Sequence, residues 1–150
     1  MTAKADYAVR ACAELAARFG EGPVKGVRLA QAQAIPLKFL ENILLELRRS
    51  GLVRSQRGAE GGYWLAKPPA EVTVADVLRA VDGPLADVHG LPPEEVGYGG
   101  PAAGLVNVWV AARASLRSVL DHVTLADLVA DDMPDVVVDL CATPDAWSRR

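Results

Sequence analysis

The feature that most constrains the fold is the spacing of apolar side chains between residues 37 and 47. Leucine and isoleucine recur there three or four positions apart, which is the period of one face of an α-helix. Pro36 suits the start of this helix because a first-turn residue needs no backbone N–H donor, and Gly51 is a favourable stop. The predicted buried stripe consists of Leu37, Leu40, Ile43, Leu44 and Leu47. A short helix expected over residues 28–33 precedes it, and two helices joined by a tight turn form a helix-turn-helix candidate.

A small hairpin is predicted directly after this pair of helices. Residues 52–56 and 62–66 are short segments rich in strand-favouring side chains. Gly58 and Gly61 lie between them and permit the positive φ angles of a tight turn. A helix-turn-helix followed at once by a Gly-rich hairpin is the layout of a winged helix.

Further elements are expected on both sides of this unit. Apolar residues three and four apart predict a helix over residues 3–19, and residues 24–27 are expected to form a short strand. Thr73 and Asp76 form a capping box that starts a helix extending to about Val81. The predicted fold class is therefore mostly α (α+β), a winged helix-turn-helix domain with a long C-terminal dimerisation helix.

The back half is expected to carry that long helix, over about residues 102–123. Its apolar residues alternate in spacings of four and three, which is a heptad seam. The seam consists of Leu105, Trp109, Ala112, Leu116, Val119 and Val123. A second subunit is the favoured partner for it, and burial within one subunit is the alternative. The predicted division of the chain is a DNA-binding domain (1–83), a Gly/Pro-rich loop of possible sensing function (84–104), dimerisation helices (105–132) and a loosely held acidic tail (133–150).

Charge is distributed unevenly along the chain. Residues 1–67 hold eleven Lys/Arg and six Asp/Glu, whereas residues 68–150 hold five Lys/Arg and thirteen Asp/Glu. A basic front half on an acidic chain indicates that the front meets a polyanion such as double-stranded DNA. Chance is the alternative explanation for so small an excess.

Composition excludes several other classes of protein. No apolar run is long enough to span a bilayer, and the N-terminus does not resemble a signal peptide, so we expect a cytoplasmic bacterial protein without a membrane partner. Cys12 and Cys141 are too few for a disulfide scaffold or a four-thiolate zinc site. Cys12 lies on the apolar stripe of its helix, which favours a buried structural thiol over a reactive one. No nucleophile–base pair, metal-ligand spacing or phosphate-binding loop indicates an enzyme.

Residues 35–84 contain a long motif. It comprises Gly51-Leu52-Val53-Arg54-Ser55, Arg57-Gly58, Gly61-Gly62-Tyr63, Leu65-Ala66, Pro69 and Ala80-Val81-Asp82-Gly83, with Tyr7-Ala8-Val9-Arg10 before it and Trp109 and Thr124–Leu128 after it. In this motif, over roughly residues 3–130, the chain resembles the Rrf2 family of bacterial transcription regulators. That resemblance implies a dimeric winged-helix DNA-binding protein.

The loop over residues 84–104 departs from the family's pattern. Members of the family that bind an iron–sulfur cluster carry three cysteines there, and this loop has none. Such clusters draw on several thiolates, so we expect no cofactor and no metal site. The loop instead offers four candidate effector-binding residues: His89, Glu94, Glu95 and Tyr98. His89 with Glu94 or Glu95 holding a divalent ion is one alternative, and plain solvation of these side chains is the other.

The winged-helix interpretation assigns DNA-binding roles to exposed residues. Lys38 is suited to guanine or phosphate, Glu41 to cytosine N4, and Asn42 to adenine or phosphate. The alternatives are a solvated helix face or an intrahelical pairing of Glu41 with Lys38. Phe39 is expected to pack in the core or to touch a thymine methyl group. Arg57 and Gly58 are expected to place the hairpin at the minor groove. Expected phosphate contacts are Arg28, Gln31, Gln33 and Arg54.

Two further hairpin residues are unusual. Glu60 adds a negative charge that is expected to weaken or restrict DNA binding. Trp64 is expected to face DNA, a second subunit or an effector.

The sequence therefore predicts a sequence-specific transcriptional regulator that binds a palindromic operator as a homodimer. Repression is favoured over activation, and a small-molecule effector or a redox signal is expected to control binding. The alternative is a winged-helix protein-interaction module without sequence-specific DNA binding.

Overall fold

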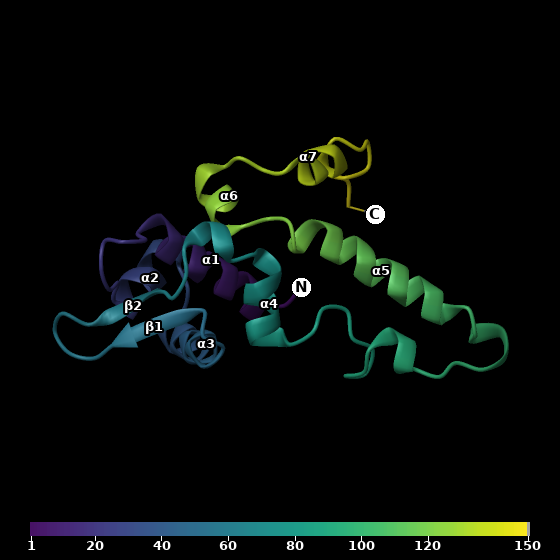
Figure 1. The fold of residues 1–150 in the computed structure, drawn as a ribbon, viewed down its shortest axis with the longest axis horizontal. Coiled ribbons are helices and arrows are strands. Elements are labelled where there is room, and N and C mark those ends of the chain that lie inside the picture. The colour runs from purple at the N-terminus through teal and green to yellow at the C-terminus, as the bar shows by residue number, and fades with distance from the viewer. Residues whose placement is uncertain (150) are drawn as a thin grey trace.

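The computed structural model describes residues 1–149, which form a helical head and a projecting helical arm (Figure 1). The head comprises α1 (Ala3–Ala17), α2 (Gly26–Gln33), α3 (Leu37–Arg49), β1 (Val53–Gln56), β2 (Gly62–Leu65) and α4 (Val74–Asp82), with a 3-10 turn at Pro69–Glu71. The remainder comprises 3-10 turns at Pro93–Glu95 and Gly100–Ala102, then α5 (Leu105–Leu120), α6 (Leu125–Ala130) and α7 (Asp135–Cys141). The predicted order of the major elements in the head is confirmed.

The core of the head forms where α1 packs against α3 and α4. Leu40, Leu44 and Leu47 of α3 are fully buried and meet the apolar face of α1. Cys12 belongs to that face, and burial raises the pKa of its thiol to about 12. The prediction that the Cys12 side chain is buried is confirmed.

Two details of the helix-turn-helix differ from expectation. Leu37 was predicted to be buried with the rest of the apolar stripe, but it is 38% exposed and lies at the edge of that stripe. The expected strand over residues 24–27 reduces to one bridge between Val24 and Tyr63, because α2 already begins at Gly26. The turn between α2 and α3 passes through Ala34, which takes a left-handed conformation with φ of 51°.

The hairpin is an antiparallel pair of strands that extends from the head. Val53 pairs with Leu65 and faces the core, whereas Arg54 pairs with Trp64 on the other face. Gly62 is required at the base, because a Cβ there would lie 2.5 Å from the carbonyl oxygen of Val24. The result is a wing, residues 57–61, held on a two-stranded base to which Val24 adds a single bridge.

The back half of the chain is attached to the head beside α4. Thr73 and Thr124 each begin a helix with a complete capping box, as predicted for Thr73. The backbone N–H of Val74 donates to the carbonyl oxygen of Val123, 2.9 Å away. Val123 is consequently buried in the core of its own subunit, so the prediction that it continues a seam for a second subunit is corrected.

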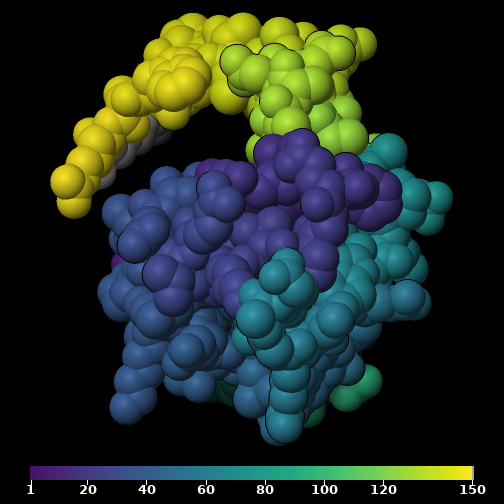
Figure 2. Space-filling model, turned by 90° about the vertical axis from the view of Figure 1, so that its left-hand side faces the viewer, coloured from purple at the N-terminus to yellow at the C-terminus, as the bar shows by residue number. Residues whose placement is uncertain are grey.

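α5 is an arm that extends away from the head, with the chain of residues 84–104 running along it (Figure 1). α5 is shorter at both ends than the helix predicted over residues 102–123, since Gly104 is its N-cap and Asp121 is its C-cap. The C-terminal tail is not wholly irregular as expected, since α7 forms there and Met133 and Val137 pack against the neighbouring apolar cluster. Figure 2 shows this segment arching above the head. Within residues 1–149, no helix is both long and apolar enough to cross a bilayer.

Candidate nucleic-acid interface

The N-terminal half of α3 presents a polar face to solvent. Lys38, Glu41 and Asn42 are all exposed, while the neighbouring Leu40 and Ile43 are buried. Among the described residues no ion pair joins Lys38 to Glu41, so the two side chains do not neutralise each other as the alternative proposed. This half of α3 therefore offers a donor, an acceptor and an amide, which are the groups that read base edges in a major groove.

Phe39 extends this face with an apolar group. Its ring is 50% exposed and meets the ring of Tyr7 edge to face, with centroids 6.0 Å apart. Arg10 in turn lies over the Tyr7 ring, 5.4 Å from its centroid. Phe39 is thus outside the core, and of the two expected roles only contact with a thymine methyl group stays a prediction.

The wing presents Arg57 and Gly58 at its tip. Both are exposed, and Gly58 has a φ of 102° with open space around its Cα. Gly61 has a different role from Gly58, because a Cβ at Gly61 would lie 2.1 Å from the carbonyl oxygen of Gln56 inside the wing. Lys25 fixes the wing to the head by donating from Nζ to the carbonyl oxygen of Gly58, 3.2 Å away. No sequence motif singles out Lys25, and only the fold brings it to the wing.

The residues expected to contact phosphates differ in their freedom to do so. Arg28, Gln31 and Arg54 are exposed. The Gln33 side chain instead accepts from Nε of Arg10 and donates to Glu14 Oε1 at 2.6 Å, and Arg10 also binds its carbonyl oxygen. Gln33 therefore joins α2 to α1, and we leave it out of the interface proposed below.

Trp64 lies on the face of the hairpin opposite to the core-facing pair of Val53 and Leu65. It lines a groove of about 480 Å³ together with Phe19, Pro23 and Gln56. Trp64 thus lies beside the connection from α1 to α2.

The arm exposes an apolar surface. No residue of α5 is buried, although most of its side chains are apolar. The predicted seam divides into two parts: Trp109 (38% exposed), Ala112 and Leu116 (43% exposed) face solvent, whereas Val119 packs against the subunit's own core. Leu105 is half-buried at the start of the helix.

Two of the four candidate effector residues are engaged with α5. Glu94 accepts a hydrogen bond from Arg113 at 2.6 Å. Its own backbone N–H, and next the hydrogen bond from Arg113, lower the pKa of the Glu94 carboxyl. The indole N–H of Trp109 donates to the hydroxyl oxygen of Tyr98 at 3.1 Å. Glu95 is exposed, and His89 is exposed with a left-handed φ of 52°. The structure thus brings Glu94 and Tyr98 to the arm and leaves His89 and Glu95 apart from them.

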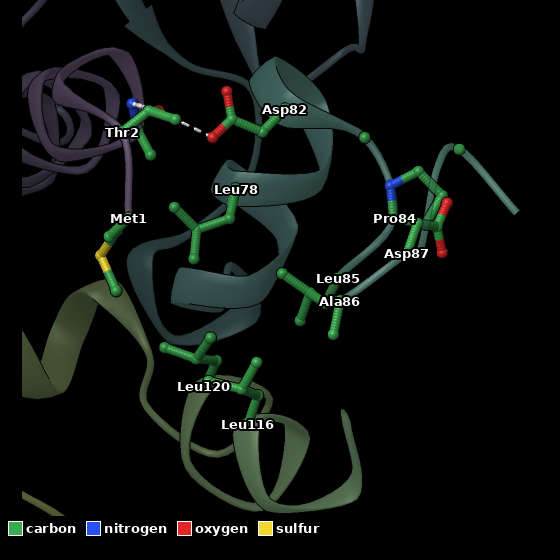
Figure 3. A pocket seen from close by; sticks show the side chains of 13 residues that line it. Met1, Thr2, Leu78, Asp82, Pro84, Leu85, Ala86, Asp87, Leu116 and Leu120 are labelled. Atoms are coloured by element: carbon green, nitrogen blue, oxygen red, sulfur yellow. Dashed lines mark hydrogen bonds between the residues drawn. The ribbon is translucent and has the colours of Figure 1, made fainter. Parts of the chain in front are cut away.

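A cavity of about 650 Å³ opens where the arm meets the head (Figure 3). Leu78 of α4, Leu85 and the α5 residues Leu116 and Leu120 form its apolar walls. Asp82 lies at its edge and accepts a hydrogen bond from the Thr2 hydroxyl at 2.8 Å. The cavity therefore adjoins both the head and the arm.

The family model for Rrf2, described as iron-dependent transcriptional regulators, matches residues 1–131. The chain belongs to the Rrf2 family. It is 51% identical over 140 residues to an HTH-type transcriptional regulator of Mycobacterium tuberculosis, a match that covers 93% of this chain and 87% of the relative. It is 36% identical over 130 residues to the HTH-type transcriptional regulator CymR of Bacillus subtilis, covering 87% of this chain and 89% of CymR.

Solved structures of Rrf2 relatives have the same fold. The structure of B. subtilis CymR, the global cysteine regulator of that organism, aligns with a TM-score of 0.74 at 34% identity over 87% of this chain and 96% of CymR. That of T. potens IscR aligns with a TM-score of 0.71 at 35% identity over 87% of this chain and 86% of IscR. This Rrf2 chain is therefore a transcriptional regulator with a DNA-binding winged-helix fold, and not an enzyme.

The iron dependence in the family's description does not fit the donor residues of this member. Across residues 1–149, no group of three or more His, Cys, Asp or Glu side chains could hold a metal ion. Cys12 is enclosed in the core, and Cys141 is exposed on α7. Iron–sulfur clusters are held by several thiolates, which these two separated cysteines do not supply.

Proposed function

We propose that this Rrf2 protein binds a palindromic operator as a homodimer and represses the adjacent genes. The observation that carries the proposal is the placement of an exposed face of α3, with Lys38, Glu41 and Asn42, on the same head as a wing that presents Arg57. Such a helix is suited to the major groove and such a wing to the adjacent minor groove.

Base preference would come from α3. Glu41 repels phosphates, so its net contribution depends on a cytosine N4 donor being in reach. Lys38 attracts any sequence and adds affinity at guanine. Arg28, Gln31 and Arg54 would hold the backbone and set the register of α3 without reading sequence.

Dimerisation would cover the exposed apolar surface of α5. Trp109, Ala112 and Leu116 recur at three- and four-residue intervals, which suits pairing with the same helix of a second copy. A two-fold dimer would present two heads to half-sites about one helical turn apart, roughly 34–36 Å. The acidic back halves would then lie away from the duplex.

A small-molecule effector would act where residues 84–104 meet the arm. The contacts of Glu94 with Arg113 and of Tyr98 with Trp109 join this segment to α5, and the cavity beside Leu116 opens at the same junction. A ligand there would change the position of the arm relative to the head and so the spacing of the two heads. We propose that this regulation proceeds without an iron–sulfur cluster, and the visible absorption spectrum of anaerobically purified protein tests that statement.

The test of the whole proposal is selection of genomic DNA fragments by the purified protein, sequenced at low and at moderate salt. We expect one palindrome to be enriched at both salt concentrations. Binding without sequence preference that vanishes as salt rises would refute sequence-specific recognition. A chain carrying Glu94→Gln and Tyr98→Phe that keeps a full regulatory response in cells would refute the effector assignment alone.

A further inference from the structure

A small cation-lined cavity lies at the N-terminal end of α2. It measures about 160 Å³ and is bounded by the connection from α1 to α2. Three basic side chains from different positions line it: Arg18 after the last turn of α1, Lys25 at the cap of α2, and Arg28 in the first turn of α2. Glu21 is the one carboxylate in the lining.

The charges around this cavity oppose the dipole of α2. A helix carries partial positive charge at its N-terminus, where acidic side chains are favourable and cations are not. The first turn of α2 contains no acidic residue, and no side chain caps it. Lys25 and Arg28 therefore add positive charge to an end that is already positive. Local conflicts of this kind are expected at functional sites, and an anion would resolve this one.

Arg18 adds an unsatisfied donor to the same place. Its guanidinium is held by Glu14, whose Oε2 lies 3.3 Å from Nη2. Its Nε is buried and has no hydrogen-bond partner in the described part of the chain. A buried donor without an acceptor is uncommon in folded proteins. Glu14 thus holds the guanidinium beside the cavity, and 34% of the Arg18 side chain stays exposed to solvent there.

Lys25 connects this cavity to the wing. Its Nζ donates to the carbonyl oxygen of Gly58 in the wing, next to Arg57. The first helix of a helix-turn-helix crosses the sugar–phosphate backbone when the second lies in the major groove. The anion that would reach the N-terminal end of α2 in such a complex is a phosphodiester of the DNA backbone.

We propose that Arg18 and Lys25, with Arg28, form a clamp for one backbone phosphate between the groove read by α3 and the groove read by the wing. This inference rests on the proposed function and extends it, because it assigns a contact to two residues that no sequence pattern indicated. The clamp sets the position of α3 along the duplex. It carries no base preference of its own.

The first test measures DNA affinity against salt concentration for wild type, Arg18→Gln, Lys25→Gln and the double variant. Arg117→Gln is the matched control, since it removes the same charge from α5 on the arm. Each single variant is expected to reduce the slope of log K against log salt by about 1, equally on operator and random duplex. The double variant is expected to lose about 1 as well, because both side chains hold the same phosphate. A loss of about 2 in the double variant, or single variants that match Arg117→Gln, would overturn the clamp.

The second test replaces the phosphates of the duplex one at a time by neutral methylphosphonate. Wild type is expected to lose affinity strongly at one backbone position per half-site, and Lys25→Gln is expected to lose little at that same position. An unchanged profile in Lys25→Gln overturns the proposal. A site for free anions would give a different pair of results. Inorganic phosphate would raise the melting temperature of wild type, while wild type and Lys25→Gln would have the same methylphosphonate profile.

These outcomes separate the clamp from the proposed function. The clamp contacts backbone only, so its salt signature is measurable on random duplex even if genomic selection enriches no palindrome. Conversely, if the protein selects one palindrome and its affinity does not depend on Arg18 or Lys25, the proposed function stands and the clamp is refuted. Thermal unfolding of each variant checks that the head is intact. Lys25→Gln removes an unfavourable cation from a helix N-terminus but also an exposed hydrogen bond to Gly58, so only a small change in melting temperature is expected.

Discussion

Replacing Trp109 by Glu is expected to dissociate the proposed dimer. Trp109 is 38% exposed in the single subunit. A Trp side chain buries about 200 Å² when fully covered, so a partner covering the exposed part would remove roughly 80 Å² from water. At ~25 cal/mol per Å² this is about 2 kcal/mol, and a two-fold interface contains the residue twice. The loss of about 4 kcal/mol corresponds to a dissociation constant raised on the order of a thousandfold, before any cost of burying the new carboxylate.

Sedimentation equilibrium over a range of protein concentrations measures this change. Trp147→Glu is the matched control, because it makes the same substitution at a tail position that is 83% exposed. We expect the control to dimerise like wild type and Trp109→Glu to sediment as a folded monomer, with folding checked by circular dichroism. An unchanged dimer in Trp109→Glu would show that α5 is covered in another way, and a monomeric wild type would refute the dimer itself.

Four further outcomes are expected. Lys38→Ala is expected to weaken binding to the best operator by about 1–3 kcal/mol, whereas Glu41→Ala relaxes base preference with little loss of affinity; wild-type behaviour of both in anisotropy titrations would contradict the recognition-helix assignment. Ala34→Gly is expected to raise the free energy of unfolding by roughly 0.5–1 kcal/mol in urea titrations. The left-handed backbone costs alanine ~1–2 kcal/mol, and the greater entropy of glycine in the unfolded chain offsets part of the stability gained by removing that cost. The backbone N–H and hydroxyl of Thr124 lower the pKa of Asp127, so wild type is expected to be more stable than Asp127→Asn at neutral pH and to lose this advantage as the pH falls below about 4, measured by thermal unfolding against pH. Because burial raises the pKa of Cys12 to about 12, only one of the two thiols is expected to react with iodoacetamide in the native protein at pH 8, and mass spectrometry of two modified thiols would contradict the core placement.

Local sequence signals were sufficient for the helix-turn-helix and the wing. The period of Leu40, Leu44 and Leu47 predicts both the helix and its buried face, because side chains three and four residues apart share one side of a helix. The capping box at Thr73 and the glycines of the wing act through neighbouring backbone atoms. Signals of this kind depend on a few consecutive residues, and they were also sufficient to choose Lys38, Glu41 and Asn42 as the exposed face of α3.

The back half was predicted less well because its pattern is ambiguous. An apolar heptad seam is the same whether the partner is another subunit or the subunit's own head. The structure divides the seam, with Trp109 exposed on the arm and Val123 buried beneath α4. α7 was missed because its apolar residues lie among aspartates and prolines, a composition that predicts a loosely held tail. The structure shows Val137 packed against the adjoining apolar cluster.

By itself the sequence determined the fold of the head and the chemistry available on α3, since both follow from short-range periodicity and residue type, and its resemblance to the Rrf2 family indicated a DNA-binding class. Only the tertiary structure decided which polar side chains are free. It engages Gln33 with Arg10 and Glu14 and brings Lys25 to the wing. The physical reason is that charge and hydrogen-bond complementarity depend on distances of a few ångströms between elements, and those distances are set by how the helices pack rather than by spacing along the chain.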